Sequence, residues 1–158
     1  MAQPSGEPVK EQIMANLQTT LEGVNGGASY YTDFSKVERV EAGGVQVKTF
    51  PTAIISPLGT EYDSPNAVVT TKIGATFRVE ITVFLRTRSN ATRAVERAIR
   101  DVHTALYVDR TRGGLAIDTR VAGSDPFYPS EATEPICGAD ISVSITYRTQ
   151  ATDLNTAG

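Results

Sequence analysis

The sequence has few of the side chains on which most enzyme chemistry depends. Its 158 residues include one histidine, one cysteine and no tryptophan. Cys137 alone cannot form an intrachain disulfide, a cysteine metal cluster or a redox pair, and we expect a small buried thiol. His103 has no second histidine with which to share a metal, so we predict a solvated or hydrogen-bonded structural role for it.

Long apolar runs are also missing. Runs such as residues 83–85 are far too short to span a membrane, and the polar start MAQPSGEPVK lacks the apolar segment of a signal peptide. We therefore expect a soluble chain made in the cytosol, with no membrane partner. The net charge of −3 lacks the basic excess typical of proteins that wrap nucleic acid.

What is present is typical of one globular domain. Hydrophobic residues make up 40% and charged residues 21%, and the length suffices for a core without disulfides. Residues 8–148 are predicted to form a single α+β domain. Residues 1–7 and 149–158 have no periodic pattern, so we expect flexible terminal segments there.

Two amphipathic helices are predicted. Val9, Ile13, Leu17 and Leu21 recur every four residues after Pro8, and Gly23 or residues 26–27 can end this helix. The second helix begins after Ser89 or Asn90 and has one apolar face over residues 91–106.

The remaining periodic segments favour strands. Alternation is cleanest over residues 77–85, which we expect to pair with residues 68–72 across a turn at 73–75. Shorter strands are predicted at 37–41, 52–56, 117–121 and 140–148, with long loops at 57–66 and between the last two strands. The pattern predicts an α+β fold, an antiparallel sheet with two main helices packed on one face.

The pair Gly113–Gly114 raises the question of phosphate binding. A phosphate loop places its glycines before a helix, so that backbone N–H groups point at the anion. Here the glycines follow a helix and precede a strand. A turn at the end of the helix is therefore the preferred interpretation.

Five arginines form the most basic region. Three of them lie opposite the apolar face of the second helix and two follow it: Arg93, Arg97, Arg100, Arg110 and Arg112. They are candidates for a subunit interface with a neighbour's carboxylates, or for DNA phosphates. An ordinary solvated face, with Glu96 pairing with Arg100, is the alternative.

The two long loops carry carboxylates and aromatics without periodicity, as partner-binding loops do. The candidates are Glu61, Tyr62 and Asp63 in the first loop, and Asp125, Phe127, Tyr128, Glu131 and Glu134 in the second. Tyr62 has an equally good alternative role in sealing the core. Neither loop has calcium-binding spacing, and we find no nucleophile with a base, metal constellation or cofactor motif. We therefore expect no enzyme, no catalytic residue, no metal and no cofactor.

Several stretches together resemble the tail terminator, or tail completion, proteins of long-tailed bacteriophages. They are KEQIMANLQTTLEGV, a strand at Tyr30–Tyr31, IRDVHTALYVDRTRGGLAIDTRV and EPICGADISVSITYRT. The resemblance implies an α+β fold and a ring, usually of six subunits, that caps the head-proximal end of the tail tube. It also implies partners in the tube protein and the head connector, passage of DNA without sequence reading, and a place in the neck of a virion assembled in the host cytoplasm.

Two other interpretations stay open. A head-completion or connector protein of the phage neck also needs a ring and loops. A small nucleic-acid-binding module would use the arginines and bind DNA with steep salt dependence, against which the negative net charge argues.

Overall fold

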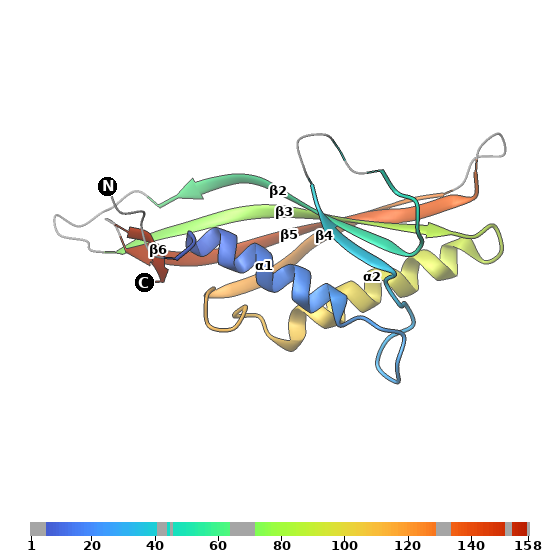
Figure 1. Ribbon diagram of the computed structural model, residues 1–158, viewed down its shortest axis with the longest axis horizontal. Coiled ribbons are helices and arrows are strands. Elements are labelled where there is room, and N and C mark those ends of the chain that lie inside the picture. Colours follow the sequence, from blue (N-terminus) through green and yellow to red (C-terminus); the bar gives the residue numbers. More distant parts are fainter. Residues whose placement is uncertain are drawn as a thin grey trace.

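Two helices lie along one side of a long sheet in the computed structural model (Figure 1). The structure describes residues 6–40, 44, 46–63, 72–128, 134–150 and 153–157. Along the chain the elements are α1 (Val9–Glu22), β1 (Lys36–Arg39), β2 (Thr52–Tyr62), β3 (Lys72–Arg86), α2 (Ala91–Val108), β4 (Asp118–Phe127), β5 (Ile136–Gln150) and β6 (Asp153–Ala157). The predicted α+β class is confirmed.

The sheet is mixed, not antiparallel as predicted. Its order is β1-β2-β3-β5-β4, and β6 pairs with β5. The β1–β2 pair is parallel, with Lys36 opposite Thr52 and Arg39 opposite Ile55. All other pairs are antiparallel.

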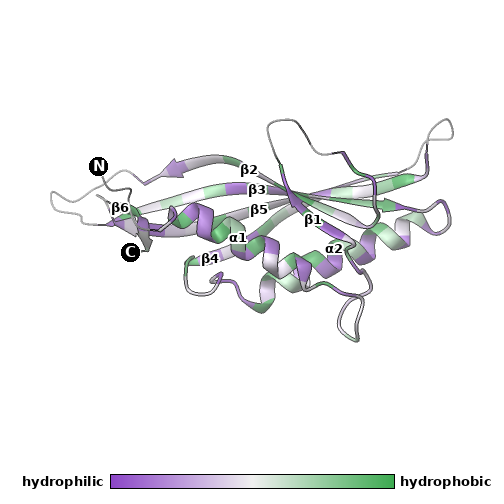
Figure 2. Ribbon diagram, viewed as in Figure 1, coloured by the Kyte–Doolittle hydropathy of each residue, from purple (hydrophilic) through white to green (hydrophobic). Residues whose placement is uncertain are grey.

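Both helices form where the apolar periodicity placed them. In α1 the buried side chains are Val9, Ile13, Met14, Leu17 and Leu21, and the helix ends at Gly23. Asn90 occupies the N-cap position of α2, but with a left-handed φ of 53° and no side-chain capping bond. Hydrophobic and hydrophilic residues alternate along both helices, as amphipathic packing requires (Figure 2).

The core lies between these helices and one face of the sheet. Odd-numbered residues of β3 and β5, such as Phe77, Ile81, Ile141 and Ile145, are buried there with the apolar faces of α1 and α2. Even-numbered residues point to the other face, which neither α1 nor α2 covers, and we call it the uncovered face. This face is largely polar, with Thr76, Arg78, Glu80 and Thr82 on β3 and their neighbours on β5.

Apolar side chains interrupt the uncovered face at Ile54, opposite Thr82, and at one aromatic pair. The rings of Phe84 and Phe127 contact each other with centroids 5.8 Å apart. Gly138 lies directly opposite both residues, on the strand between them. A Cβ atom at Gly138 would lie 1.7 Å from the backbone oxygen of Val83 and 2.8 Å from the Phe127 ring, so no larger residue fits without a shift.

The strands run further than the sequence pattern indicated. Residues 57–62, predicted as loop, belong to β2, and a register shift between Pro57 and Thr60 accommodates the proline. Residues 73–75, predicted as a turn, lie inside β3, so β2 rather than residues 68–72 pairs with it. Residues 68–71 lie outside the described part of the chain.

We predicted a flexible segment over residues 149–158, and its described residues lie in strands. β5 continues to Gln150, and β6 adds to the same strand. The side chain of Gln12 donates a hydrogen bond to the backbone oxygen of Asn155 at 3.2 Å, and Asn155 donates to the oxygen of Gly6 at 3.1 Å. These bonds fasten the last strand to the start of α1. Residues 1–5 lie outside the described part.

Candidate functional surfaces

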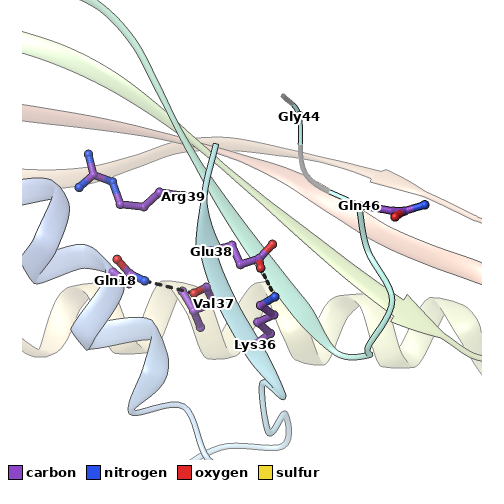
Figure 3. A pocket seen from close by; sticks show the side chains of 7 residues that line it. All are labelled: Gln18, Lys36, Val37, Glu38, Arg39, Gly44 and Gln46. Carbon is purple, nitrogen blue, oxygen red and sulfur yellow. Dashed lines mark hydrogen bonds and ion pairs between the residues drawn. The ribbon is translucent and has the colours of Figure 1, made fainter. Parts of the chain in front are cut away.

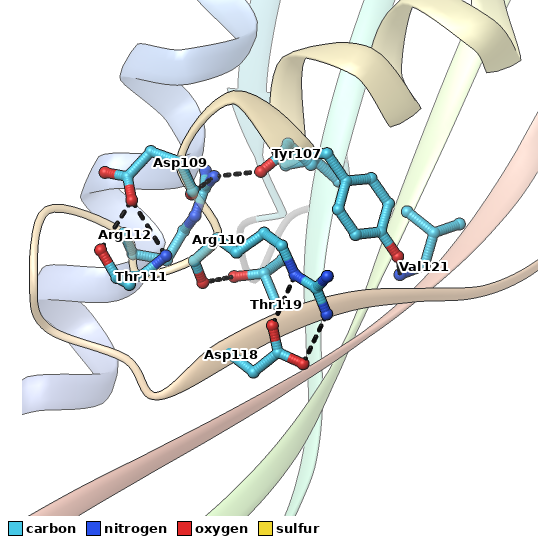
Figure 4. Close-up of polar contacts among 9 residues, drawn as sticks. Tyr107, Asp109, Arg110, Thr111, Arg112, Asp118, Thr119 and Val121 are labelled. Carbon is cyan, nitrogen blue, oxygen red and sulfur yellow. Dashed lines mark hydrogen bonds and ion pairs between the residues drawn. The ribbon is translucent and has the colours of Figure 1, made fainter.

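The Gly113–Gly114 turn binds a carboxylate of its own chain. Both glycines have positive φ, 71° and 84°, as a turn after a helix requires. The Asp109 carboxylate accepts hydrogen bonds from the hydroxyl of Thr111 and from the N–H groups of Thr111 and Gly113, at 2.6, 2.9 and 2.7 Å (Figure 4). These bonds lower the pKa of Asp109, and the bond from the Thr111 hydroxyl has the largest effect. Because Asp109 already occupies these donors, the turn is not an open phosphate site.

Arg112 and Arg110 stabilise the connection between α2 and β4, which contains this turn, and we call the connection the α2–β4 joint. Arg112 is fully buried and donates to the backbone oxygens of Leu106, at 2.5 Å, and Asp109, and to the hydroxyl of Thr20 at 3.2 Å. Arg110 holds Asp118 through two bonds of 2.7 and 2.8 Å. The prediction of Arg112 as a subunit contact is wrong, because a buried side chain reaches no neighbour. Arg110 is exposed but already paired.

A hollow of about 490 Å³ lies beside β1 and holds polar side chains that partner one another (Figure 3). Lys36 pairs with Glu38, and Gln18 donates to the oxygen of Val37 at 3.2 Å. Arg39 binds both carboxylate oxygens of Glu11, which lowers the pKa of Glu11. The charged side chains of this lining are therefore engaged in ion pairs.

A second basic region forms around Tyr31, and we call it the Tyr31 surface: Tyr31, Arg97 and Arg100. The guanidinium carbons of Arg97 and Arg100 lie 4.6 and 5.5 Å from the centre of the Tyr31 ring. That ring stays 63% exposed. Tyr30 and Tyr31 lie in a loop, not in the strand implied by the resemblance. The expected pairing of Arg100 with Glu96 is also wrong, since Arg100 binds the buried Asp101 at 2.9 Å.

The predicted partner-binding segments lie at opposite ends of the molecule (Figure 1). Glu61 and Tyr62 end β2, followed by Asp63; Tyr62 is 53% exposed. At the other end, Tyr128 is 46% exposed just after β4, and Glu134 lies 3.8 Å from Arg86. Asp125 and Phe127 belong to β4, not to a loop as predicted. Glu131 lies outside the described residues.

The uncovered face has a basic region and an acidic region at different positions along its strands. Arg78 and Arg120 flank Ser144 on adjacent strands, beside a groove of about 560 Å³. Further along, Asp125 lies directly opposite Asp140. The hydroxyl of Thr82 donates to Asp140 at 2.8 Å. In the described part of the chain, neither aspartate forms an ion pair.

The two side chains with the greatest potential for catalytic chemistry, His103 and Cys137, lie on different elements. His103 is exposed on α2, with its ring 4.5 Å from that of Tyr107. Cys137 is buried in β5, as predicted, and its burial raises the pKa of the thiol. Among the described residues no group of three or more His, Cys, Asp or Glu could hold a metal ion, and no described helix is long and apolar enough to cross a membrane.

No protein-family model matches the chain, and no curated protein matches its sequence.

Proposed function

We propose that the protein is a phage tail terminator, a ring-forming structural protein that caps the tail tube, stops its growth and offers the surface for joining to the head. The observation that carries the proposal is the placement of two exposed aromatic segments, around Tyr62 and around Tyr128, at opposite ends of the folded molecule. β3 alone spans about 50 Å between these ends, at roughly 3.3 Å per residue.

This shape suits a protein that bridges two different partners. Aromatic side chains are enriched where protein interfaces are fully desolvated, and each end carries one beside exposed carboxylates. The resemblance described above supplies the identity of the two partners, the tube protein and the head connector. Genomic DNA would pass through the ring without its sequence being read.

The arginines give less support to a nucleic-acid-binding module. Arg110 pairs with Asp118 and Arg112 is buried, so two of the five candidate arginines are engaged inside the molecule. Cations that already serve internal contacts neutralise few phosphates, and phosphate neutralisation supplies most of such affinity. We also propose no enzymatic activity, since His103 and Cys137 lie on different elements and, among the described residues, no metal-binding group forms.

The test is the length of the tails that a phage makes without this gene, imaged together with its heads. Overlong tubes without heads are the expected result. Tails of normal length that fail to join heads would assign the protein to the connector side of the neck, whose ring and loops would have the same shape. Infectious particles of ordinary appearance would contradict both roles. Complementation with the wild-type chain provides the control.

A further inference from the structure

We propose that copies of this chain associate front to back, with the Tyr31 surface of one copy against Asp125 and Asp140 on the uncovered face of the next. This contact rests on the proposed ring and names the surfaces that build it.

The Tyr31 surface is held in place before any partner arrives. The loop that carries Tyr31 is fixed on α2 by the Asp101 carboxylate, which accepts the N–H of Thr32 at 2.7 Å. Arg100 donates to the backbone oxygen of Ser29, also at 2.7 Å. A rigid, exposed tyrosine between two arginines has the composition of an interface hot spot. A hollow of about 290 Å³ beside Tyr31 and Arg97 leaves room for a partner's side chain.

The opposite surface needs positive charge. Asp125 and Asp140 are cross-strand neighbours, and like charges in that position destabilise a sheet. Glu80 lies two residues before Thr82 on the same face and adds a third carboxylate. Thr82 satisfies one oxygen of Asp140, but no lysine or arginine pairs with either aspartate in the part of the chain that the structure describes. Arginines of a neighbouring copy would relieve this repulsion.

These two surfaces cannot meet within one copy. The Tyr31 surface lies on the helix side of the sheet, and the two aspartates lie on the uncovered side. A contact between two different surfaces is heterologous, and its repetition closes a ring when the rotation between copies allows.

Joining of sheet edges is the less suitable alternative. β4, an edge strand, has a register shift after Val121 and a proline at 126, and the part of β2 that extends beyond β1 has a register shift after Pro57. Bulges and prolines are the features by which proteins discourage the pairing of edge strands. Contact through side chains on the two faces is therefore favoured.

Charge reversal tests this contact, with the assembly state measured by sedimentation velocity and native mass spectrometry. Arg97→Glu and Asp125→Lys should each raise the concentration for half assembly about tenfold or more. The double variant should recover assembly, because the pair is restored with its signs exchanged. An equimolar mixture of the two single variants should also recover it, since alternating copies pair opposite charges at every contact.

Arg148→Glu is the matched control, because Arg148 is exposed at the other end of β5 and the same reversal there should leave assembly unchanged. Circular dichroism and the unfolding midpoint establish that each variant is folded. Tyr31→Ala should weaken assembly without rescue by Asp125→Lys. The wild-type ring should also dissociate as ionic strength rises.

The outcomes separate this contact from the proposed function. A wild-type ring that tolerates both single reversals overturns the contact and leaves the terminator role intact. Single reversals that weaken assembly without recovery in the double variant or the mixture also overturn it. A wild-type chain that stays monomeric at high concentration contradicts the contact and the self-assembled ring together.

Discussion

The buried carboxylate of Asp101 accepts the backbone N–H of Thr32 at 2.7 Å, and this bond joins α2 to the loop that carries Tyr31. The side chain of Asp101 has no exposed surface and lies among the inward-facing residues of the helix. Its other oxygen accepts Arg100 at 2.9 Å. A single carboxylate thus determines both the position of the loop and the direction of one arginine beside Tyr31.

Replacement of Asp101 by asparagine should lower the free energy of unfolding by about 1–3 kcal/mol, because an amide leaves one of these buried hydrogen bonds unmade. Chemical denaturation measures the change. Asp33→Asn is the control, since Asp33 is exposed in the same loop, and its effect should stay within about 0.5 kcal/mol. Equal effects of the two substitutions would show that Asp101 does not fasten the loop.

Arg112 should prove necessary for the joint between α2 and β4. Arg112→Ala leaves the oxygens of Leu106 and Asp109 without their donor and opens a cavity, so we expect a loss of about 2–4 kcal/mol in unfolding free energy. Arg120→Ala, at an exposed position of β4, should change it by less than about 0.5 kcal/mol. If Arg112→Ala were as mild as Arg120→Ala, the joint would not depend on this guanidinium.

The close packing over Gly138 makes a sharper comparison between two glycines on adjacent strands. Gly138→Ala places a methyl group against the backbone of Val83, and it should cost about 3 kcal/mol or prevent soluble expression. Gly123→Ala meets no atom within 4 Å and should be close to neutral. Thermal unfolding of both variants checks this, and a tolerated Gly138→Ala would mean that β3 and β5 do not approach as closely as described.

The turn around Asp109 should make stability depend on acid pH. The folded-state pKa of Asp109 is lowered from an ordinary value of 3.8, so its contribution is present above that value and is lost as the pH falls through the folded pKa. Asp109→Asn should therefore be less stable at pH 7 and lose less on acidification between pH 5 and 3. Unfolding midpoints across this range measure the slope. A slope equal to that of the wild type would contradict the assignment.

The sequence pattern predicted the helices and the alternation of β3 well, because α1 and α2 each bury one regular apolar stripe. It failed where tertiary pairing outweighed local preference. Pro57 and Gly59 are typical of a loop, yet a bulge keeps them in β2, and Asp125 and Pro126 remain in β4 because β5 pairs with them.

The candidate sites were predictable by composition but not by placement. The glycine order at 113–114 already favoured a turn, and the structure adds that Asp109 fills it. Arg112 is buried and Arg97 is exposed, but the sequence pattern did not distinguish them. The residues before each arginine are of similar polarity. Asp101 was also missed, since a charged residue in a helix is usually solvated. Only the path of residues 25–33 over α2 explains its burial.

The two ends of the molecule should prove separable in binding. Tyr62→Ala and Tyr128→Ala each remove one exposed aromatic, and each should weaken one of the two partners, tube protein or head connector, by about 30-fold while leaving the other unchanged. Affinities of the purified ring for each partner measure this. Tyr62→Phe is the matched control, because it keeps the aromatic ring and loses only the hydroxyl. Parallel loss of both partners in either variant would mean that the substitution disturbs the whole assembly, and unchanged binding in both would remove the aromatics from the contact surfaces.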